Sequence, residues 1–234
     1  MLVSVIVPNH GRDLTELIES VNRSTYKNVE IVVVDEGKER SVQRNLGIAR
    51  AKGYHFLILD SDQSVSPNLI AECVVRIRNG YSCCYIPEII IAKSFFGKIR
   101  AFERTFYVAT AVDVPRFVVR THCQDFDESM TGPEDADWSR RIMGARTTTK
   151  SVLYHHDDIS FIEYCKKKAY YTKSMENYIK KHPTDDCINI WYRCVTVFVE
   201  NGKWRKLLKH PILSIGILFI LITRGIIFYG NRTS

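Results

Sequence analysis

The segment "LILDSDQSVSPNLI", residues 57–70, joins an apolar run to two acids and then to a helix start. A short apolar run of this kind is typical of a strand that is buried on both faces of a sheet. Ser66 and Pro67 fit the N-cap and the first turn of the helix that follows. Asp60 and Asp62 therefore stand at the end of a strand, which is where open α/β sheets bind their ligands.

The same alternation of strand and helix surrounds this segment. Continuous β-branched runs at 2–7 and 29–34 predict two more buried parallel strands, and helical patterns at 13–21 and 41–52 separate the three. Three later segments have the composition of strands: "YSCCYI" (81–86), "RFVVR" (116–120) and "TTTKSVLYHHDD" (147–158). The sequence thus predicts an α/β fold with a mixed, mainly parallel, Rossmann-like sheet flanked by helices.

Polar residues follow each of the first three predicted strands, as "PNHGR" (8–12), "DEGKER" (35–40) and "DSDQS" (60–64). The carboxyl ends of parallel strands meet at one edge of a sheet. We therefore expect these three segments to converge and to form a binding site.

Asp60 and Asp62 taken alone support two interpretations. Residues i and i+2 of an extended segment point the same way, so the two carboxylates are expected to face one ligand. Like charges this close repel, and a hard cation such as Mg²⁺ or Mn²⁺ would relieve the repulsion and bind phosphate oxygens. The other interpretation is a solvated turn in which one aspartate caps the next helix.

Two later polar segments are also ambiguous. In "GPEDADW" (132–138), Glu134 and Asp135 follow Pro133 at a helix start. Acids there complement the helix dipole, and the same position would orient a carboxylate for general-base catalysis. In "YHHDD" (154–158), His155 is either a surface residue or a group that contacts a metal or a diphosphate.

The number and order of these segments resemble family 2 glycosyltransferases of the GT-A fold over most of residues 1–160. The motifs that carry the resemblance are "VSVIVPNHGR" (3–12), "VVVDEG" (32–37), "QRNLGIARAKG" (43–53), "LILDSDQSVSPNLI" (57–70), "FDESMTGPEDADWSRR" (126–141) and "VLYHHDD" (152–158). The tail is similar to that of membrane-associated microbial members, which build lipid-linked or surface glycans. The resemblance implies an inverting hexosyltransferase with a nucleotide-sugar donor. Its acceptor would be a lipid-linked glycan, a polyprenyl phosphate or a polysaccharide.

The resemblance also assigns residues to the donor. The positions that match its nucleotide-sugar-binding motifs are Pro8, His10, Arg12, Asp35, Arg44 and Asp60. Two departures, His10-Gly11 and Glu36 after Asp35, replace residues that the family usually carries. The identity of the base and of the sugar therefore stays open.

The remaining roles concern the metal and the chemistry. Asp60, Asp62 and His155 match the segments that hold a Mn²⁺ or Mg²⁺ ion in the family. Asp135 matches the general base, with Glu134 beside it. In an inverting displacement the base and the metal lie on opposite faces of the anomeric carbon, so they must come from separate segments.

Two other functions compete with this one. The segment "DSDQSV" (60–65) also resembles the motif of haloacid-dehalogenase-type phosphatases, with Asp60 as the nucleophile. In that family the motif closes the first strand, whereas two strand and helix units precede it here. The third possibility is an inactive, membrane-tethered scaffold that binds a nucleotide sugar.

The excess positive charge of the chain lies in its last third. The net charge is +7, and residues 163–234 hold 13 Lys and Arg against 5 Asp and Glu. The apolar run "ILSIGILFILITRGIIFYG" (212–230) follows, so these basic residues fit a juxtamembrane segment attracted to anionic lipid better than a nucleic-acid-binding surface.

The run at 212–230 predicts a membrane anchor. About 18 helical residues reach roughly 27 Å, slightly short of a hydrocarbon core of about 30 Å. We expect Arg224 to snorkel to the far interface and the catalytic part to lie on the cytoplasmic side. A buried core helix and a helix in the interface plane are the alternatives. The predicted parts are a glycosyltransferase domain (1–160), a basic helical region (161–210) and the anchor (211–230).

Overall fold

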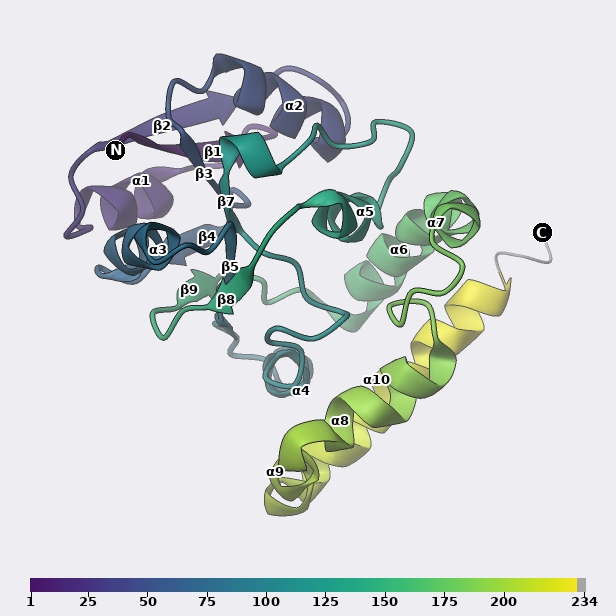
Figure 1. The fold of residues 1–234 in the computed structure, drawn as a ribbon. Helices are drawn as coiled ribbons and strands as arrows, with labels where there is room; N and C mark the ends of the chain where they lie inside the picture. The colour runs from purple at the N-terminus through teal and green to yellow at the C-terminus, as the bar shows by residue number, and fades with distance from the viewer. Residues whose placement is uncertain (231–234) are drawn as a thin grey trace.

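The computed structural model describes residues 1–230, and its main sheet has six strands in the order β2-β1-β3-β7-β5-β8 (Figure 1). These strands are β1 (Val3–Pro8), β2 (Val29–Val34), β3 (His55–Ile58), β5 (Cys83–Tyr85), β7 (Phe117–Val119) and β8 (Arg146–Thr148). β1 runs parallel to β2 and β3, and β5 runs parallel to β8, whereas β7 is antiparallel to both of its neighbours. The mixed, mainly parallel sheet predicted from the sequence is confirmed.

Helices cover both faces of this sheet because successive side chains of a strand point to opposite faces, and here the side chains on both faces are apolar. The covering helices are α1 (Thr15–Asn22), α2 (Arg40–Arg50), α3 (Leu69–Arg78) and α5 (Glu134–Arg141). Val3, Val5 and Val7 of β1 pack with residues of α1 and α3, while Ile6 packs on the opposite face with residues of α2 and α5 (Figure 1). The carboxyl ends of β1, β2 and β3 are thereby fixed at one edge of the sheet.

A second, three-stranded sheet lies beside the first and was not predicted. It has the order β4-β9-β6, with β4 (Gln63–Val65), β9 (Leu153–His155) and β6 (Glu88–Ile90). The prediction of a single strand at 147–158 is wrong, because β8 ends at Thr148 and the chain turns before β9. Glu72 of α3 stabilises that turn, since its carboxylate accepts the backbone N–H groups of Lys150 and Ser151, both at 2.8 Å.

This contact predicts a pH-dependent contribution to stability. Burial opposes ionisation of Glu72, but the two N–H groups and Arg76 lower its pKa to about 2 from an ordinary value of 4.5. The contribution is therefore present above about pH 4.5 and is lost as the pH falls towards 2. We expect Glu72→Gln to lower the free energy of unfolding at pH 7, and the difference from wild type to shrink between these pH values. Urea titrations at pH 7, 4 and 2.5 would measure it, and a constant difference would contradict the assignment.

The C-terminal helix α10 (Pro211–Gly230) packs along α4 (Phe95–Arg104) and α6 (Phe161–Tyr171). Gly216 permits the close approach, because a Cβ atom there would lie 2.6 Å from Ile99. Arg224 forms an ion pair with Glu103 of α4, with Nη2 and Oε2 2.8 Å apart. The expectation that Arg224 snorkels to a far interface is therefore wrong, since a buried carboxylate of the globular part binds its guanidinium.

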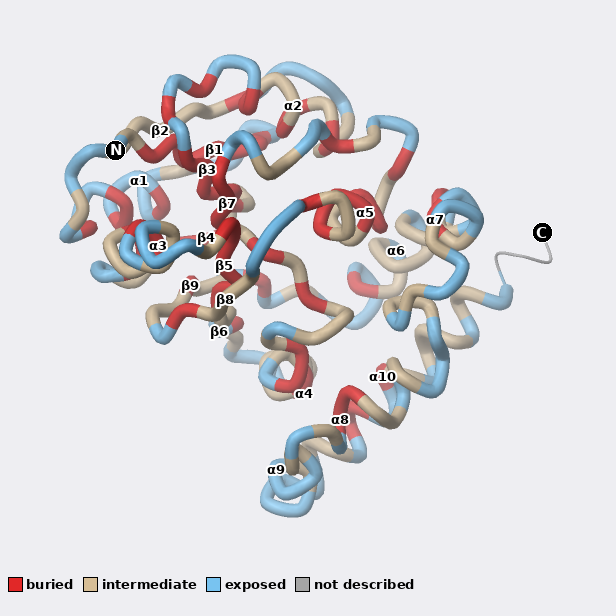
Figure 2. Tube along the Cα trace, in the orientation of Figure 1, coloured by how far each residue is buried: buried red, intermediate tan, exposed pale blue. Residues whose placement is uncertain are grey.

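The opposite face of α10 is apolar and uncovered. Its large exposed side chains are Ile212, Ile215, Leu218, Phe219, Ile222, Ile226 and Tyr229. Within residues 1–230, α10 is the one helix that is long and apolar enough to cross a membrane. Figure 2 shows how the exposed face of α10 continues into α9 (Trp204–Lys209). Two short helices, α7 (Met175–Lys181) and α8 (Val197–Val199), complete the C-terminal part.

Candidate functional site

The loops after β1, β2 and β3 meet at one edge of the main sheet, as predicted. Asn9 Nδ2 donates to Asp35 Oδ1 at 2.9 Å, which ties the first loop to the second. Arg12 Nη1 donates to Asp62 Oδ2 at 2.6 Å, which ties the first loop to the third. His10 and Arg12 are exposed at this edge, whereas Pro8 is buried as the last residue of β1.

Asp60 and Asp62 do not lie in an extended segment. Gln63 N donates to the carbonyl oxygen of Asp60 at 3.0 Å and closes a turn between them. The two carboxylates have different partners, so the prediction that they point the same way from an extended segment is wrong. Their charges are balanced by side-chain cations, which are Arg44 and Arg116 for Asp60, and Arg12 and His155 for Asp62.

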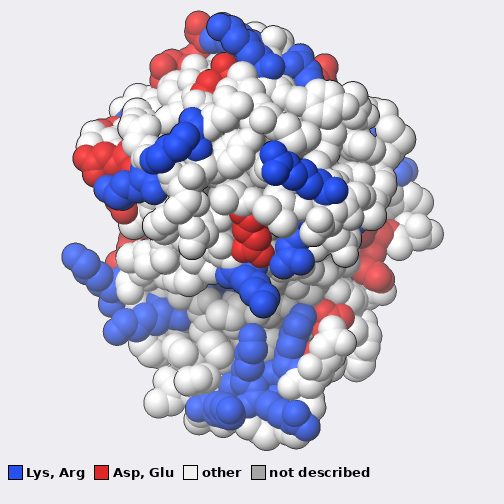
Figure 3. All heavy atoms as spheres, turned by 60° about the vertical axis from the view of Figure 1, so that its left-hand side comes forward, with Lys and Arg blue, Asp and Glu red and all other residues white. Residues whose placement is uncertain are grey.

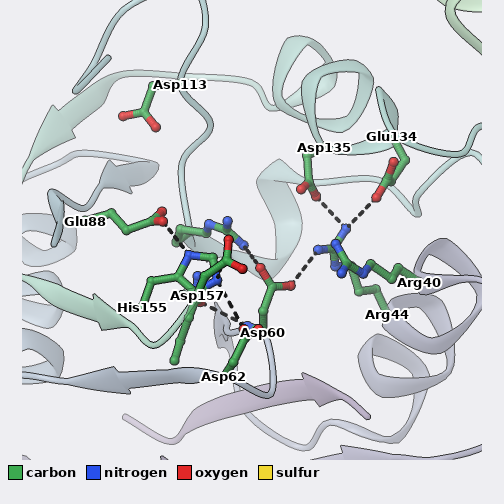
Figure 4. Close-up of polar contacts among 12 residues, drawn as sticks. Arg40, Arg44, Asp60, Asp62, Glu88, Asp113, Glu134, Asp135, His155 and Asp157 are labelled. Carbon is green, nitrogen blue, oxygen red and sulfur yellow. Dashed lines mark hydrogen bonds and ion pairs between the residues drawn. The ribbon is translucent and has the colours of Figure 1, made fainter. Parts of the chain in front are cut away.

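Arg44 joins residues that are far apart in the sequence (Figure 4). Its side chain is fully buried, and Nη1 lies 2.5 Å from Asp135 Oδ1 and 3.3 Å from Glu134 Oε1. Its Nη2 lies 3.1 Å from Asp60 Oδ1. One guanidinium therefore holds the acid after β3 and both acids at the start of α5 in a single cluster. Burial opposes ionisation of Asp60, but Arg116, Arg44 and Arg40 hold the pKa of its carboxyl well below its ordinary value.

The second sheet places His155 beside Asp62. Gln63 pairs with His155 in the antiparallel register of β4 and β9, and His156 N donates to the carbonyl oxygen of Asp62 at 2.9 Å. His155 Nδ1 lies 2.6 Å from Glu88 Oε1, and its Nε2 lies 3.3 Å from Asp62 Oδ1. Burial disfavours the imidazolium, but the bonds to Asp62 and Glu88 raise the pKa of His155 to about 9. The ring thus carries a proton at neutral pH in this arrangement.

Glu134 and Asp135 differ in accessibility although they are adjacent. The side chain of Asp135 is 28% exposed, against 6% for Glu134. Glu134 Oε2 is buried without a hydrogen-bond partner among the described residues. Burial and the neighbouring charge of Asp135 raise the pKa of Glu134. Asp135 is therefore the more accessible acid of this pair.

Two cavities meet at these acids. Cavity A, of about 370 Å³, is lined by His10, Arg12, Lys38, Arg40, Glu134 and Tyr171, among others. Cavity B, of about 520 Å³, is lined by Arg116, Asp135, His155, Lys168, Tyr171 and Arg224, among others. Gly132 and Tyr171 line both cavities. The acids at the start of α5 thus stand between two spaces, each large enough for a small ligand.

Several residues of this site were not predicted from the sequence. Arg40 lines cavity A, and its Nη1 donates to Tyr171 Oη at 3.2 Å. Burial lowers the pKa of its guanidinium, but the charges of Asp60 and Asp135 raise that pKa above its ordinary value. Its position four residues before Arg44 places both on one face of α2, and this spacing was the available signal. Tyr171 carried no such signal, because it reaches the site from α6, 131 residues from Arg40.

The donor set suits a hard divalent cation in chemical type but is not preformed for one. Carboxylate oxygens and an imidazole nitrogen are ligands for Mg²⁺ and Mn²⁺. Among residues 1–230, no group of three or more His, Cys, Asp and Glu side chains has the arrangement of a metal site. Asp62 and His155 face each other at 3.3 Å, and Arg12 occupies the other oxygen of Asp62.

Known proteins share this architecture. No family model matches the sequence. Glycosyltransferase GlyG of Streptococcus pneumoniae serotype 4 is 34% identical over a segment that covers 30% of this chain and 33% of GlyG. The crystal structure of S. aureus TarS covers 88% of this chain and 45% of TarS, with a TM-score of 0.52 and 14% identity. The chain has the fold of TarS over most of its length. A shorter TarS chain, crystallised in complex with UDP, covers all of this chain and 92% of its own length, with a TM-score of 0.51 and 13% identity.

The two matches differ in how much of each protein they cover and in what kind of similarity they show. The match to GlyG spans about a third of that relative, and TarS at 14% identity is similar in fold. The glycosyltransferase fold expected from the motifs therefore has a counterpart among solved structures. The assignment to family 2, the donor and the acceptor stay predictions.

Proposed function

We propose that this protein is an inverting glycosyltransferase that moves a sugar from a nucleotide-sugar donor to a hydroxyl-bearing acceptor. The observation that carries the proposal is the cluster around Arg44, which holds Asp60 and Asp135 on one guanidinium between two cavities. In the reaction, an acceptor hydroxyl forms a bond to the anomeric carbon as the bond to the diphosphate breaks, and Asp135 takes the hydroxyl proton. Glu134 positions Asp135 through their shared partner, Arg44.

Cavity A is the proposed donor site. Its lining includes His10, Arg12, Lys38 and Arg40. The nitrogen atoms of these side chains would donate hydrogen bonds to a diphosphate, and the cationic side chains would also balance its charge. Asp35 lies exposed beside Asn9 at the same edge of the sheet, where it is available to a nucleotide base. UDP in the crystal structure of the TarS chain is consistent with a nucleotide ligand for this fold.

A Mn²⁺ or Mg²⁺ ion is part of the proposal. Asp62 and His155 would hold it, with His155 giving up its proton and Arg12 turning to the donor phosphates. Asp60 would bind the ion only if its ion pair with Arg44 or with Arg116 opened. When bound, such an ion supplies positive charge to the departing diphosphate.

Asp62→Ala tests this assignment. We expect the affinity for a UDP-sugar in the presence of Mn²⁺ to fall by about tenfold or more, because the variant lacks the accessible carboxylate next to His155. Calorimetry with and without Mn²⁺ would show wild type gaining affinity from the metal and the variant gaining little. Asp13→Asn is a suitable control, because Asp13 is exposed and its carboxylate accepts hydrogen bonds from Thr15, two residues along the same turn. An unchanged metal effect in Asp62→Ala would remove the metal from this position.

The function itself is tested by a donor screen. The full chain is incubated with UDP-, GDP- and dTDP-sugars, Mn²⁺ and a membrane lipid extract, and release of nucleoside diphosphate is measured together with labelled product. A glycosyltransferase releases the diphosphate in proportion to the product. Release of phosphate from small phosphoesters without a sugar donor would instead support the phosphatase. Donor binding without any turnover would support the scaffold.

The contacts of both Asp60 oxygens are evidence against a phosphatase that uses Asp60 as the nucleophile. Arg44 Nη2 lies 3.1 Å from Oδ1, and Arg116 Nη1 lies 3.5 Å from Oδ2. A nucleophilic carboxylate needs a free oxygen that points to the substrate. The position of Asp60 after the third strand of the sheet points the same way.

Membrane attachment is also proposed, in a form that the packing of α10 suggests. One face of α10 is fastened to α4 and α6, so its uncovered apolar face would lie in the membrane interface with the helix parallel to the bilayer. The neighbouring α9 adds Trp204 and several basic residues, and Figure 3 shows Lys and Arg side chains gathered at the lower end of the molecule, where α9 lies in Figure 1. Aromatic and basic residues of this kind suit an anionic lipid surface.

This attachment predicts selectivity for lipid charge. We expect the chain to co-sediment more strongly with phosphatidylglycerol vesicles than with phosphatidylcholine vesicles, and salt to weaken the binding. The double variant Arg205→Glu and Lys209→Glu should weaken binding by at least about tenfold, since each exposed basic residue contributes about 1 kcal/mol. Equal, salt-insensitive binding to both vesicles would contradict an electrostatic contribution from α9.

A further inference from the structure

Cavities A and B are separate spaces, although the proposed reaction needs both. Glu134 lines cavity A, the proposed donor site, whereas Asp135, the proposed base, lines cavity B. In the described part of the chain, Gly132 and Tyr171 are the two residues that line both cavities. A residue that lines two cavities lies between them. Gly132 and Tyr171 therefore form a wall between the donor and the base, and a donor sugar has to pass this wall to reach Asp135.

The wall can open at one place. Gly132 has a φ of +100°, and a Cβ atom built on it would lie 2.8 Å from Tyr171 Cα and 2.6 Å from Tyr171 Cβ. The two backbones are thus in close contact, and Gly132 has no side chain that could turn. Glu134 and Asp135 are held by Arg44. The ring of Tyr171 is therefore the part of the wall that can turn aside while the backbones stay in contact.

Arg40 holds this ring from cavity A. Its Nη1 donates to Tyr171 Oη at 3.2 Å, and Tyr171 is the last residue of α6. Burial raises the pKa of Tyr171 to about 12, so the hydroxyl is neutral at pH 7. Among residues 1–230, no carboxylate forms an ion pair with Arg40, and its hydrogen-bond partner is this neutral oxygen. A charged phosphate oxygen accepts from a guanidinium about twice as strongly as a neutral oxygen does. A diphosphate in cavity A would therefore take Arg40 from Tyr171.

We propose that Tyr171 closes the passage between cavities A and B in the free protein, and that a nucleoside diphosphate in cavity A opens it by binding Arg40. The freed ring turns aside, and the sugar of the donor reaches Asp135. The diphosphate shifts this equilibrium because it gains Arg40 only in the open state. Tyr171 is thus a positioning residue, since it touches no reacting atom and acts through Arg40. The inference rests on the proposed glycosyl transfer and adds a step to it, in which the bound donor opens its own way to the base.

The first test measures binding to the full chain by calorimetry in the presence of Mn²⁺. The probes are UDP, GDP and dTDP, and uridine, guanosine and thymidine serve as matched probes without the diphosphate. Tyr171→Phe keeps the ring and removes the oxygen that competes for Arg40. The diphosphate that binds wild type should bind this variant about two- to tenfold more tightly, which corresponds to one net hydrogen bond, and the matched nucleoside should bind both proteins equally well. Equal or weaker binding of the diphosphate by the variant would overturn the proposal.

Arg40→Met shows whether this effect passes through the arginine. The variant should bind the diphosphate about tenfold more weakly or worse, because a charged hydrogen bond is lost. In this background Tyr171→Phe should have no further effect, since the two side chains act on the ligand as one pair. A gain from Tyr171→Phe that persisted without Arg40 would reject the role of the Arg40 contact.

Each variant has a matched control. Tyr54→Phe also removes a hydroxyl that is bonded at 3.2 Å, to Thr121 Oγ1, but Tyr54 directly precedes β3 and so lies at the opposite edge of the main sheet from the site. Arg50→Met removes an exposed arginine of the same helix α2. Both controls should bind the probes like wild type.

Fluorine NMR reports the position of the ring itself. 3-Fluorotyrosine is placed at position 171 of the full chain, and its resonance is recorded without ligand, with the diphosphate and with the matched nucleoside. The diphosphate should move the resonance to a second position, and the nucleoside should leave it in place. In the Arg40→Met chain the resonance should lie near the second position without any ligand. A resonance that the diphosphate does not move would show that the ring stays closed and would overturn the proposal.

The fluorine measurement also separates this inference from the proposed function. If the diphosphate binds and sugar is transferred while the resonance stays in place, glycosyl transfer stands and the moving ring alone is rejected. If the resonance moves with the diphosphate while no sugar is transferred, cavity A is a nucleotide site with a moving wall and the proposed transfer is rejected. If Arg40→Met failed to fold in a thermal unfolding assay, Tyr171→Phe and the fluorine signal of the otherwise wild-type chain would decide.

Discussion

Asp135→Asn is expected to lower the turnover of glycosyl transfer by about 10²- to 10⁴-fold, which is the usual contribution of a general base. Asparagine keeps the shape of the side chain and an oxygen that accepts from Arg44 Nη1, now 2.5 Å from Oδ1. It cannot accept the proton of the attacking hydroxyl. Initial rates at saturating donor and acceptor would give the fall in kcat, and calorimetry would show donor affinity close to that of wild type.

The control for this variant is Asp125→Asn, which removes an exposed aspartate of the preceding loop. It should turn over like wild type. A rate for Asp135→Asn within a few-fold of wild type would show that another group accepts the proton. A loss of donor affinity equal to the loss of rate would instead make Asp135 a binding residue.

Arg44→Met should be the most destabilising substitution in the site, by about 3–5 kcal/mol at pH 7, because it breaks a buried ion-pair cluster from one side. The Arg44 side chain is fully buried, and its removal leaves Asp60, Glu134 and Asp135 close together without their common cation. Urea unfolding at pH 7 would measure the loss. The difference from wild type should shrink as the pH falls below about 4, because carboxyl groups that lack Arg44 take up protons there, whereas the arginines of the wild type keep the pKa of Asp60 lower.

The matched control lies on the same helix. Arg50 pairs with Glu36 at the surface, with side chains 47% and 64% exposed, so Arg50→Met should change stability little. If Arg44→Met were as mild as this control, the carboxylates would have to be balanced by Arg40 and Arg116 alone. The central position of Arg44 would then be wrong.

The parts of the fold that sequence reasoning predicted share a physical cause. β1 and β2 are rich in β-branched residues, and β3 is a short apolar run that is fully buried, as is typical of parallel strands between layers of helices. Helices of eight or more residues between them complete the pattern. β4 and β6 escaped prediction because they are three residues long and contain Gln63, Ser64 and Glu88, so they are strands only by virtue of pairing with β9.

The convergence of these segments was predicted from the sequence, but the contacts between them were not. The motif positions of Asp60, Asp62, Asp135 and His155 do lie close together, because strand ends and a helix start converge at one edge. The sequence placed Arg44 at the donor, whereas the structure buries it among the acids. The burial of Arg44 depends on Asp60 and Asp135, which are 16 and 91 positions away in the sequence. A local sequence pattern contains no information on contacts between residues so far apart.

The packing of α10 bears on how the protein can be handled. Cutting an apolar tail from an enzyme is a common route to a version that purifies without detergent. Here a chain that stopped before Pro211 would lose Arg224 and leave the buried Glu103 carboxylate without its ion-pair partner. Ile99 and Tyr164, which pack with α10, would become exposed. Leu221, Arg224 and Ile227 of α10 line cavity B, and the proposed membrane attachment also uses this helix, so assays should be run on a chain that includes residues 211–230.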